Sequence, residues 1–137
     1  MIEFLKMKET DIKDVQNFLT ENKIYESGIE KYYPFMFIIK QEEKIFGLGV
    51  LDFIKGIINI NNIYVEPNNR KKGLGEGLLR TMLNFVYING NKFAYYLGDN
   101  EAIYSFFNKI GFKKYKENKL YIDIEEFFCQ PCQGTKL

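Results

Sequence analysis

Hydrophobic positions near the start of the chain first follow a strand pattern and then a helical one. Residues 2–7 predict a short opening strand, and Thr10 is a suitable N-cap for the helix expected over residues 11–21. Apolar side chains recur there at the spacing that puts them on one helix face. The residues of this face are Ile12, Val15, Phe18 and Leu19.

The next part of the chain changes to strands. Residues 22–33 are interrupted by Gly28 and fit either a second short helix or a mobile loop. Three apolar runs separated by polar turns then predict an antiparallel meander. These runs cover residues 35–39, 45–53 and 57–65.

The second half alternates helices and strands. Pro67 ends the third strand, because proline has no amide proton for a ladder. A helix running to about Ile88 carries a broad apolar face, and Asn89-Gly90 ends it. That face consists of Leu74, Leu78, Leu79, Met82, Leu83 and Val86. A strand at 93–97, a helix capped by Asp99 or Asn100 and closed by Gly111, and a hairpin of residues 112–116 and 120–124 complete the pattern.

This order of elements predicts a mixed α/β fold. We expect residues 1–124 to form a single domain and residues 125–137 a C-terminal tail. A helical crossover between the 57–65 and 93–97 strands makes those two strands parallel. The segment after the first of them then lies at its carboxyl end, where ligands bind in such sheets.

That segment is a basic, glycine-containing loop, Arg70-Lys71-Lys72-Gly73-Leu74-Gly75. A helix that begins near Lys72 or Gly73 offers about four N–H groups without internal partners and the positive end of its dipole. The two glycines let an anion approach the main chain, while the three cations supply charge. The spacing fits neither a Walker loop nor a dinucleotide-binding fingerprint. We therefore predict a diphosphate site.

Composition restricts the possible functions. The formal net charge is +1, which gives no argument for a nucleic-acid or membrane partner. The chain contains no histidine, which excludes imidazole metal ligands and a histidine general base. Cys129 and Cys132 form an isolated CxxC that we interpret as two free thiols, and no metal site is expected. No apolar run is long enough to span a membrane, so we expect a cytoplasmic protein.

Two segments resemble the GNAT superfamily of N-acetyltransferases. Ile63-Tyr64-Val65-Glu66-Pro67-Asn68-Asn69-Arg70-Lys71-Lys72-Gly73-Leu74-Gly75-Glu76-Gly77-Leu78-Leu79 is similar to the acetyl-CoA motif of that family, Arg/Gln-x-x-Gly-x-Gly/Ala after a strand ending V-x-P. Residues 100–112 resemble its N-x-x-A-x-x-L-Y-x-K-x-G-F segment, with Asn100, Phe106, Lys109, Gly111 and Phe112 in step. Two motifs in the family's order indicate the GNAT superfamily much more specifically than either motif alone.

The resemblance implies a fold, a reaction and a binding mode. The fold is a central mixed, mostly antiparallel and strongly twisted sheet of six to seven strands with about four helices. Acetyl-CoA is the acyl donor, and an amine attacks its thioester directly. The implied donor contacts are main chain at Ile63, Tyr64 and Val65, the loop residues Arg70, Lys71, Lys72, Gly73, Leu74, Gly75 and Glu76, and Asn100. A backbone N–H near Val65 is implied to stabilise the developing oxyanion.

The catalytic residues depart from the family pattern. Phe107 stands where the family has its usual general acid, a tyrosine, and Tyr104 one turn earlier is the possible substitute or simply a packed aromatic residue. The glutamate that many relatives carry on the preceding strand is missing; Asn59 and its neighbours could only orient a water. Glu66 at the strand's end is a possible base or a solvated charge.

Three functions stay open at this point. The first is an N-acetyltransferase that modifies an amine of a small molecule, peptide or protein and acts as a monomer or homodimer. The second is a non-catalytic acyl-CoA-binding regulatory module, and the third is a phosphate- or nucleotide-binding protein of another family.

Overall fold

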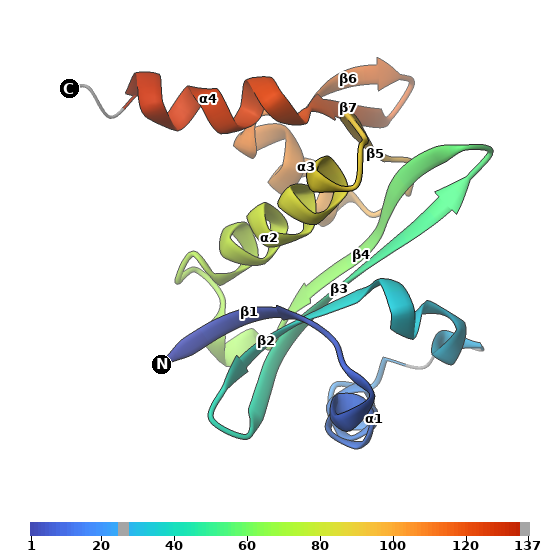
Figure 1. Ribbon diagram of the computed structural model, residues 1–137, viewed down its shortest axis with the longest axis vertical. Coiled ribbons are helices and arrows are strands. Elements are labelled where there is room, and N and C mark those ends of the chain that lie inside the picture. Colours follow the sequence, from blue (N-terminus) through green and yellow to red (C-terminus); the bar gives the residue numbers. More distant parts are fainter. Residues whose placement is uncertain (25–27, 135–137) are drawn as a thin grey trace. The chain divides into compact units, whose positions relative to one another are not determined.

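The computed structural model describes residues 1–24 and 28–134, and their side chains as far as Cys129. The strands are β1 (Ile2–Lys6), β2 (Met36–Gln41), β3 (Lys44–Ile54), β4 (Ile57–Val65), β5 (Phe93–Tyr96), β6 (Lys113–Lys116) and β7 (Lys119–Asp123). The α-helices are α1 (Ile12–Glu21), α2 (Leu74–Ile88), α3 (Glu101–Ile110) and α4 (Ile124–Gly134). Short 3₁₀ helices are η1 (Glu9–Asp11), η2 (Ile29–Phe35) and η3 (Pro67–Asn69). Figure 1 labels the strands and the α-helices.

The strands pair in the order β1-β2-β3-β4-β5-β7-β6. The β1–β2, β2–β3, β5–β7 and β6–β7 pairs are antiparallel, and β4 and β5 are parallel. A seven-stranded, mostly antiparallel sheet with one parallel pair at the α2 crossover confirms the predicted fold class.

The chain divides into two compact units. The first consists of Met1–Asp52 and Asn62–Met82, and the second of Phe53–Asn61 and the chain from Leu83 onward. The division cuts through β4 and α2, so each of these elements contributes to both units. The sequence-based domain boundary at residue 124 stays a prediction.

The first unit has a continuous apolar core between α1 and the amino-terminal strands. Val15 and Phe18 of α1 pack with Met36 and Ile38 of β2 and with Leu48 of β3, all almost fully buried. The helical spacing read from the sequence is therefore confirmed as the buried face of α1. The helix starts one residue later than predicted, with Asp11 and not Thr10 as the N-cap residue, because residues 9–11 form η1.

Asp11 is buried for a structural reason. Its carboxylate accepts a hydrogen bond from Lys40 Nζ at 2.9 Å and another from the Lys8 N–H at 3.0 Å. Burial acts to raise the pKa of Asp11, but these two partners outweigh it and hold the pKa below its ordinary value. The same hydrogen bond raises the pKa of Lys40. The pair ties the start of α1 to β2.

Two glycines in the first unit allow α2 to lie close to the strands. A Cβ on Gly77 of α2 would collide with the Phe4 ring of β1, and a Cβ on Gly49 of β3 would collide with Met82 of α2. The helix therefore approaches the sheet at distances that only glycine permits. This contact fixes where α2 begins, and hence where its free N–H groups lie.

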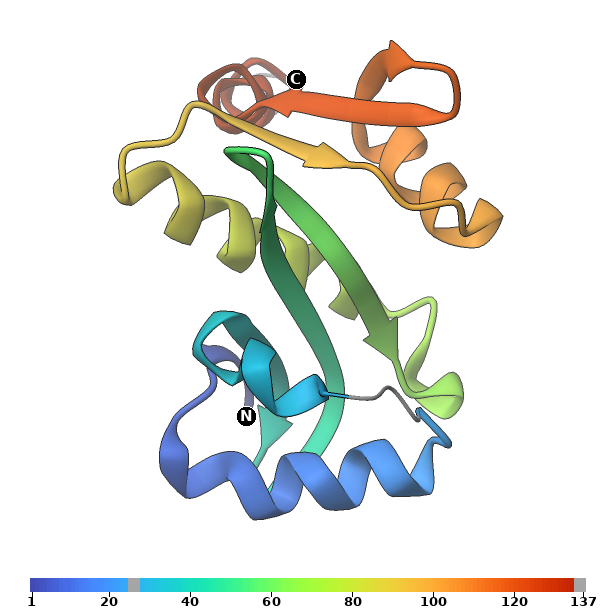
Figure 2. The same cartoon turned by 90° about the vertical axis from the view of Figure 1, so that its right-hand side faces the viewer.

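The second unit places β7 between β5 and β6. Figure 2 shows β7, in orange, alongside β5, in gold. Alternate residues of this sheet face the core, among them Ala94, Leu120 and Ile122, which are at most 4% exposed. The strand β6 has all four side chains exposed, and three of them are lysines.

The segment expected to be a tail is helical where the structure describes it. Helix α4 spans Ile124–Gly134 and follows β7 directly, with the Ile124 N–H donating to the Lys92 carbonyl at 2.9 Å. Ile124 and Phe127 are buried. The apolar residues before the CxxC thus join the core, which the short pattern in the sequence did not reveal. Cys129 is exposed, and the side chain of Cys132 lies outside the described residues.

Candidate active site

The connection between β4 and α2 contains the predicted diphosphate loop, residues 70–76, which we call the basic loop. Helix α2 begins at Leu74, one or two residues later than predicted. Before it, the backbone is left-handed at Lys71 (φ 65°) and at Gly73 (φ 77°). A left-handed conformation costs a non-glycine residue roughly 1–2 kcal/mol. Backbone turns of this kind orient successive N–H groups toward one side, which suits an anion.

The N–H groups of the basic loop have no acceptor within the described part of the chain. The hydrogen bonds closest to it are donated by Arg70, to the Pro67 carbonyl at 3.4 Å, and by Gly77, to the Gly73 carbonyl at 3.1 Å. None is donated by the main chain of residues 71–76. For residues 74–76 the reason is helix geometry, because N–H groups in the first turn of a helix have no acceptor within the helix. Six consecutive N–H groups are therefore available to an external anion.

The space beside the basic loop is open at the position where an anion would need it. A Cβ built on Gly73 meets no atom within 4 Å. The positive φ at Gly73 is a conformation that favours glycine. The missing side chain also leaves the adjoining space empty. A phosphate group could contact the main chain at this point without a clash.

The three cations of the basic loop have different partners. Arg70 Nε donates to the Val65 carbonyl at 2.7 Å, and its guanidinium lies 5.2 Å from the centre of the Tyr64 ring. Lys72 Nζ donates to Asn69 Oδ1 at 3.3 Å, and Lys71 makes no hydrogen bond among the described residues. Arg70 is thus directed back to β4, and the free positive charge nearest the N–H groups belongs to the two lysines.

The carboxyl end of β4 is held by its side chains. Ile63 is buried, and the Tyr64 hydroxyl donates to Asn22 Oδ1 at 3.1 Å while its ring contacts Phe18 edge-on at 6.0 Å. Since the side chains of Ile63 and Tyr64 are built into the first unit, only the main chain of this stretch is left for a ligand. The predicted donor contact of residues 63–65 involves this backbone and stays a prediction.

In the second unit, Asn100 has the position predicted for it. It is the N-cap of α3, and its Oδ1 accepts the Ile103 N–H at 3.0 Å. The preceding connection, residues 97–100, is folded over the buried hydroxyl of Tyr96, which accepts the Asn100 N–H at 3.0 Å. Burial raises the pKa of Tyr96, so this phenol stays neutral over the physiological range.

Asn100 and Tyr104 line the same cavity. Its volume is about 390 Å³, and the residues around it are Gly98, Asp99, Asn100, Glu101, Tyr104, Ser105 and Asn118. This size lies within the range of small-molecule pockets. The structure therefore brings together a predicted cofactor contact and the predicted acid, both at the start of α3.

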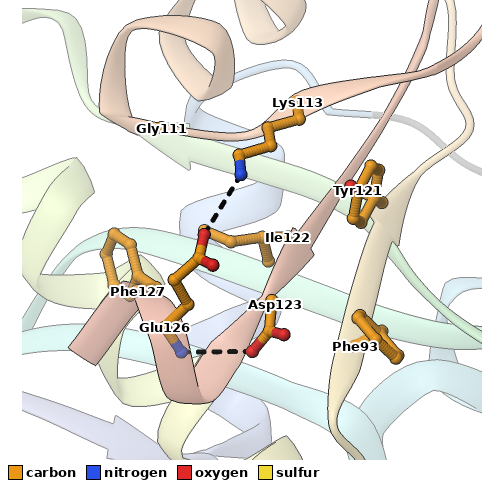
Figure 3. A pocket seen from close by; sticks show the side chains of 8 residues that line it. All are labelled: Phe93, Gly111, Lys113, Tyr121, Ile122, Asp123, Glu126 and Phe127. Carbon is orange, nitrogen blue, oxygen red and sulfur yellow. Dashed lines mark hydrogen bonds and ion pairs between the residues drawn. The ribbon is translucent and has the colours of Figure 1, made fainter. Parts of the chain in front are cut away.

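A second, smaller pocket in the same unit does not have the features of this site. Figure 3 shows it between β5, β7 and α4, with Lys113 donating to Glu126 at 3.1 Å and the Glu126 N–H donating to Asp123 at 3.1 Å. Its volume is about 90 Å³, which corresponds to roughly three water molecules. It is too small for a pantetheine-bearing ligand.

Comparison with known families agrees with this geometry. The sequence model of the acetyltransferase (GNAT) domain matches residues 33–114, which is more than half of the chain and includes both the basic loop and α3. The chain belongs to the GNAT family.

Individual relatives support the GNAT assignment. A curated N-acetyltransferase 9-like protein from Nematostella vectensis is 32% identical over 71 residues, which cover 50% of this chain and 36% of that protein. The match therefore spans about a third of the relative's length.

Solved GNAT structures share the fold. The N-acetylglutamate synthase of Neisseria gonorrhoeae, complexed with coenzyme A and N-acetyl-glutamate, matches with a TM-score of 0.69 at 17% identity, over 98% of this chain and 33% of that one. A GNAT family acetyltransferase from Brucella melitensis, in complex with acetyl-CoA, matches with a TM-score of 0.67 at 17% identity, over 90% of this chain and 88% of that one.

Against the GNAT pattern, the most informative departure is Phe107. Its side chain is fully buried, stacked on Phe112 at 4.7 Å and edge-on to Tyr96 at 5.3 Å. The position where the family's usual tyrosine would stand is a core position in this chain, and it holds no proton donor. Any acid must come from elsewhere.

The predicted base, Glu66, has a structural partner. Its Oε1 accepts a hydrogen bond from Asn69 Nδ2 at 3.1 Å, within the turn that contains η3. Farther along, Glu76 pairs with Arg80 at 3.2 Å across one helix turn, and the Leu74 side chain is buried. These contacts shape the basic loop, and the catalytic role of Glu66 stays a prediction.

The described residues contain neither a metal cluster nor a membrane-spanning helix. No group of three or more Cys, Asp or Glu side chains in this part of the chain could hold a metal ion. None of the helices in the same part has the length and apolar character to cross a bilayer.

Two side chains bind the connection that leads into α3, and from the sequence Asn59 was named only as a residue that could orient a water, and Lys119 not at all. Asn59 of β4 is 4% exposed, and its Oδ1 accepts the Leu97 N–H at 2.9 Å. Lys119 of β7 donates to the Leu97 carbonyl at 2.6 Å. The available signal was an asparagine within the apolar run Ile57-Ile58-Asn59-Ile60, since a buried amide needs hydrogen-bond partners.

Proposed function

We propose that this GNAT domain is an acetyl-CoA-dependent N-acetyltransferase that acts on an amine of a small molecule, peptide or protein. The observation that carries the proposal is the row of six N–H groups at residues 71–76, which have no acceptor among the described residues and lie beside the open space at Gly73. Two linked phosphates need several donors at short range, and a helix start provides them. The acetyl-CoA complex of the Brucella relative supports the same donor.

Each part of the donor has a proposed contact. The diphosphate binds the N–H groups of residues 71–76, with Lys71 and Lys72 supplying charge and Arg70 keeping its bond to Val65. The pantetheine amides pair with the main chain of Ile63, Tyr64 and Val65. Asn100 contacts the same arm through its Nδ2, because its Oδ1 already caps α3.

The proposed chemistry needs little from the side chains. Acetyl-CoA supplies a thioester, whose carbonyl carbon is attacked by the neutral amine. The Val65 N–H donates to the oxygen on which negative charge develops. Tyr104 donates a proton to the departing thiolate, and this is a modest demand because thiols have pKa values near ~8.5. Glu66 accepts a proton from the amine, directly or through water, after release from Asn69.

The setting of the enzyme is proposed from the charge of the chain. A net charge of +1 gives no reason to expect a nucleic-acid or membrane partner, and we propose a cytoplasmic monomer or homodimer that uses no metal.

A non-catalytic acyl-CoA-binding module is the second candidate. Two observations favour it: Phe107 is buried in the core without a proton to donate, and the Glu66 carboxylate is bonded to Asn69. Such a module would bind acyl-CoA through the same basic loop and transfer nothing.

Two measurements test these functions. Titration calorimetry with acetyl-CoA and with CoA is expected to give dissociation constants in the micromolar range typical of substrates. Absence of binding at millimolar concentration would overturn both candidates, and competition by ATP but not by CoA would favour a nucleotide-binding protein. Thiol release from acetyl-CoA with a broad panel of amines then separates the two. Acceptor-dependent release supports the enzyme, whereas binding without release supports the module.

A further inference from the structure

The connection between β5 and α3, residues 97–100, is held by side chains from three strands. Asn59 of β4 accepts the Leu97 N–H at 2.9 Å, and Lys119 of β7 donates to the Leu97 carbonyl at 2.6 Å. Tyr96, the last residue of β5, accepts the Asn100 N–H through its hydroxyl at 3.0 Å. All of these residues belong to the second unit. The main chain of the connection is therefore fixed before any ligand binds.

The hydrogen bond from the Leu97 N–H to the Asn59 side chain replaces a main-chain bond that would normally form between the two strands. In a regular parallel ladder, every second N–H of one strand donates to a carbonyl of its neighbour. The β4–β5 ladder contains the single pair Asn59↔Tyr95. Leu97 lies two residues beyond Tyr95, so its N–H faces the same side and is the next donor in line. This donor goes to the Asn59 side chain instead, and the ladder does not continue.

The Asn59 amide is shielded from water. The side chain is 4% exposed, and its neighbours in the strand, Ile58 and Ile60, are buried. An aliphatic residue would fit such a strand better, because a buried amide must find hydrogen-bond partners to offset its desolvation. The bond to Leu97 is one such partner.

We infer that Asn59 is a positioning residue for the acyl donor: by taking the Leu97 N–H, it ends the β4–β5 ladder and leaves the following edge of β4 available to the pantetheine amides. This inference rests on the proposed function. The bond between Asn59 and the Leu97 N–H has a second effect, because it fixes the start of the segment that leads to Asn100.

The test compares two ligands that differ only by the pantetheine arm. CoA should engage both the basic loop and the β4 edge, whereas 3′-phospho-ADP, the part of CoA without pantetheine, should engage the loop alone. In Asn59→Ala, Leu97 loses its acceptor and can pair with β4. We expect CoA to bind about tenfold or more weakly, since hydrogen bonds to the arm are lost, and 3′-phospho-ADP to bind within about twofold of the unmodified protein.

Two further variants sharpen the comparison. Asn59→Asp keeps a side-chain oxygen for the Leu97 N–H and is expected to retain the preference for CoA over 3′-phospho-ADP. Asn108→Ala removes an exposed asparagine from α3 and should change neither affinity. A merely structural role of Asn59 would weaken both ligands equally, so equal losses in Asn59→Ala, or no loss at all, would overturn the inference.

A measurement on the unmodified protein covers the case in which Asn59→Ala does not fold. CoA, but not 3′-phospho-ADP, is expected to slow amide hydrogen exchange at residues 61–65. Equal slowing by both ligands, or none by CoA, would contradict the inference while leaving acetyl-CoA binding intact. If the unmodified protein binds neither ligand, the proposed function fails, and the inference fails with it.

Discussion

Two connections in this chain begin at the carboxyl end of a strand, β4 or β5, and lead into a helix, yet they treat their main-chain N–H groups in opposite ways. In the basic loop, residues 71–76 donate to no acceptor within the described protein. In the β5–α3 connection, the N–H groups of Leu97 and Asn100 donate to side-chain oxygens, and so does the N–H of Ile103 in the first turn of α3. The first leaves its N–H groups without partners among the described residues, and the second binds its own to side chains of the same unit.

The residue types explain the difference. Apart from Glu76, whose carboxylate pairs with Arg80, no residue of the basic loop has a side-chain oxygen that could accept a main-chain N–H. The β5–α3 connection draws on Asn59, Tyr96 and Asn100, which supply such oxygens at short range. The presence or absence of a side-chain acceptor therefore distinguishes the two helix starts, and under the proposed function only the first of them binds the diphosphate.

The largest expected effect comes from filling the open space in the basic loop. Gly73→Val should lower CoA affinity roughly a hundredfold, because losing one or two charge-assisted hydrogen bonds of about 1.5–3 kcal/mol each is enough for this. The measurement is titration calorimetry with CoA.

Gly56→Val is the matched control for that substitution. Gly56 also has a positive φ, of 81°, and also has no atom within 4 Å of its Cβ position. Both variants should lose a similar stability of about 1–2 kcal/mol, and only the Gly73 variant should lose CoA affinity. Similar CoA affinities in the two would mean that the open space at Gly73 is unrelated to the ligand.

A second effect concerns the cavity beside the β5–α3 connection. Tyr104→Phe removes a hydroxyl that we propose as the proton donor, and kcat should fall about a hundredfold, the low end of the range for general acids. The affinity for acetyl-CoA should not change. Steady-state thiol release with an accepted amine gives kcat. An unchanged kcat would exclude Tyr104 as the acid.

A third, smaller effect tests how firmly the β5–α3 connection is assembled. Tyr96→Phe leaves the Asn100 N–H without its acceptor, and the free energy of unfolding should fall by about 1–3 kcal/mol in urea titrations. Tyr115→Phe removes an exposed hydroxyl in the same unit and should stay within about 0.5 kcal/mol. Equal losses from both would show that the Tyr96 hydroxyl does not support the connection.

The smallest effect separates the two roles proposed for Asn100. Asn100→Ala removes the cap of α3 and should cost about 0.5–2 kcal/mol of stability. Asn100→Asp keeps the capping oxygen but loses the Nδ2 donor, so it should restore stability without restoring CoA affinity. If Asn100→Asp binds CoA as tightly as the unmodified chain, Asn100 acts only as a cap.

The sequence predicted those features that depend on neighbouring residues. The buried face of α2 and a helix cap at Asp99 or Asn100 follow from local spacing, and the structure agrees with both, with Asn100 as the cap. The six free N–H groups follow from the same logic, since they belong to a loop and a first helix turn.

Features that depend on distant segments could not be predicted in the same way. Asn59 and Leu97 are 38 positions apart, and their bond exists only because of how β4 and β5 are paired. The buried Tyr96 hydroxyl depends on the fold of the connection above it. Phe107 was recognised as an exception to the family pattern, but only the packing on Phe112 and Tyr96 identifies it as a core residue.

The lysines of β6 have a consequence for the solubility of this chain. β6 has a partner, β7, on one side only, and its other side is a row of main-chain groups that another polypeptide could join. Lys114 and Lys116, together with Lys113, whose ammonium pairs with Glu126, place positive charge along this edge and repel a second copy of the same strand. Concentrated samples should therefore remain dispersed more readily at low ionic strength than at high, because salt screens this repulsion.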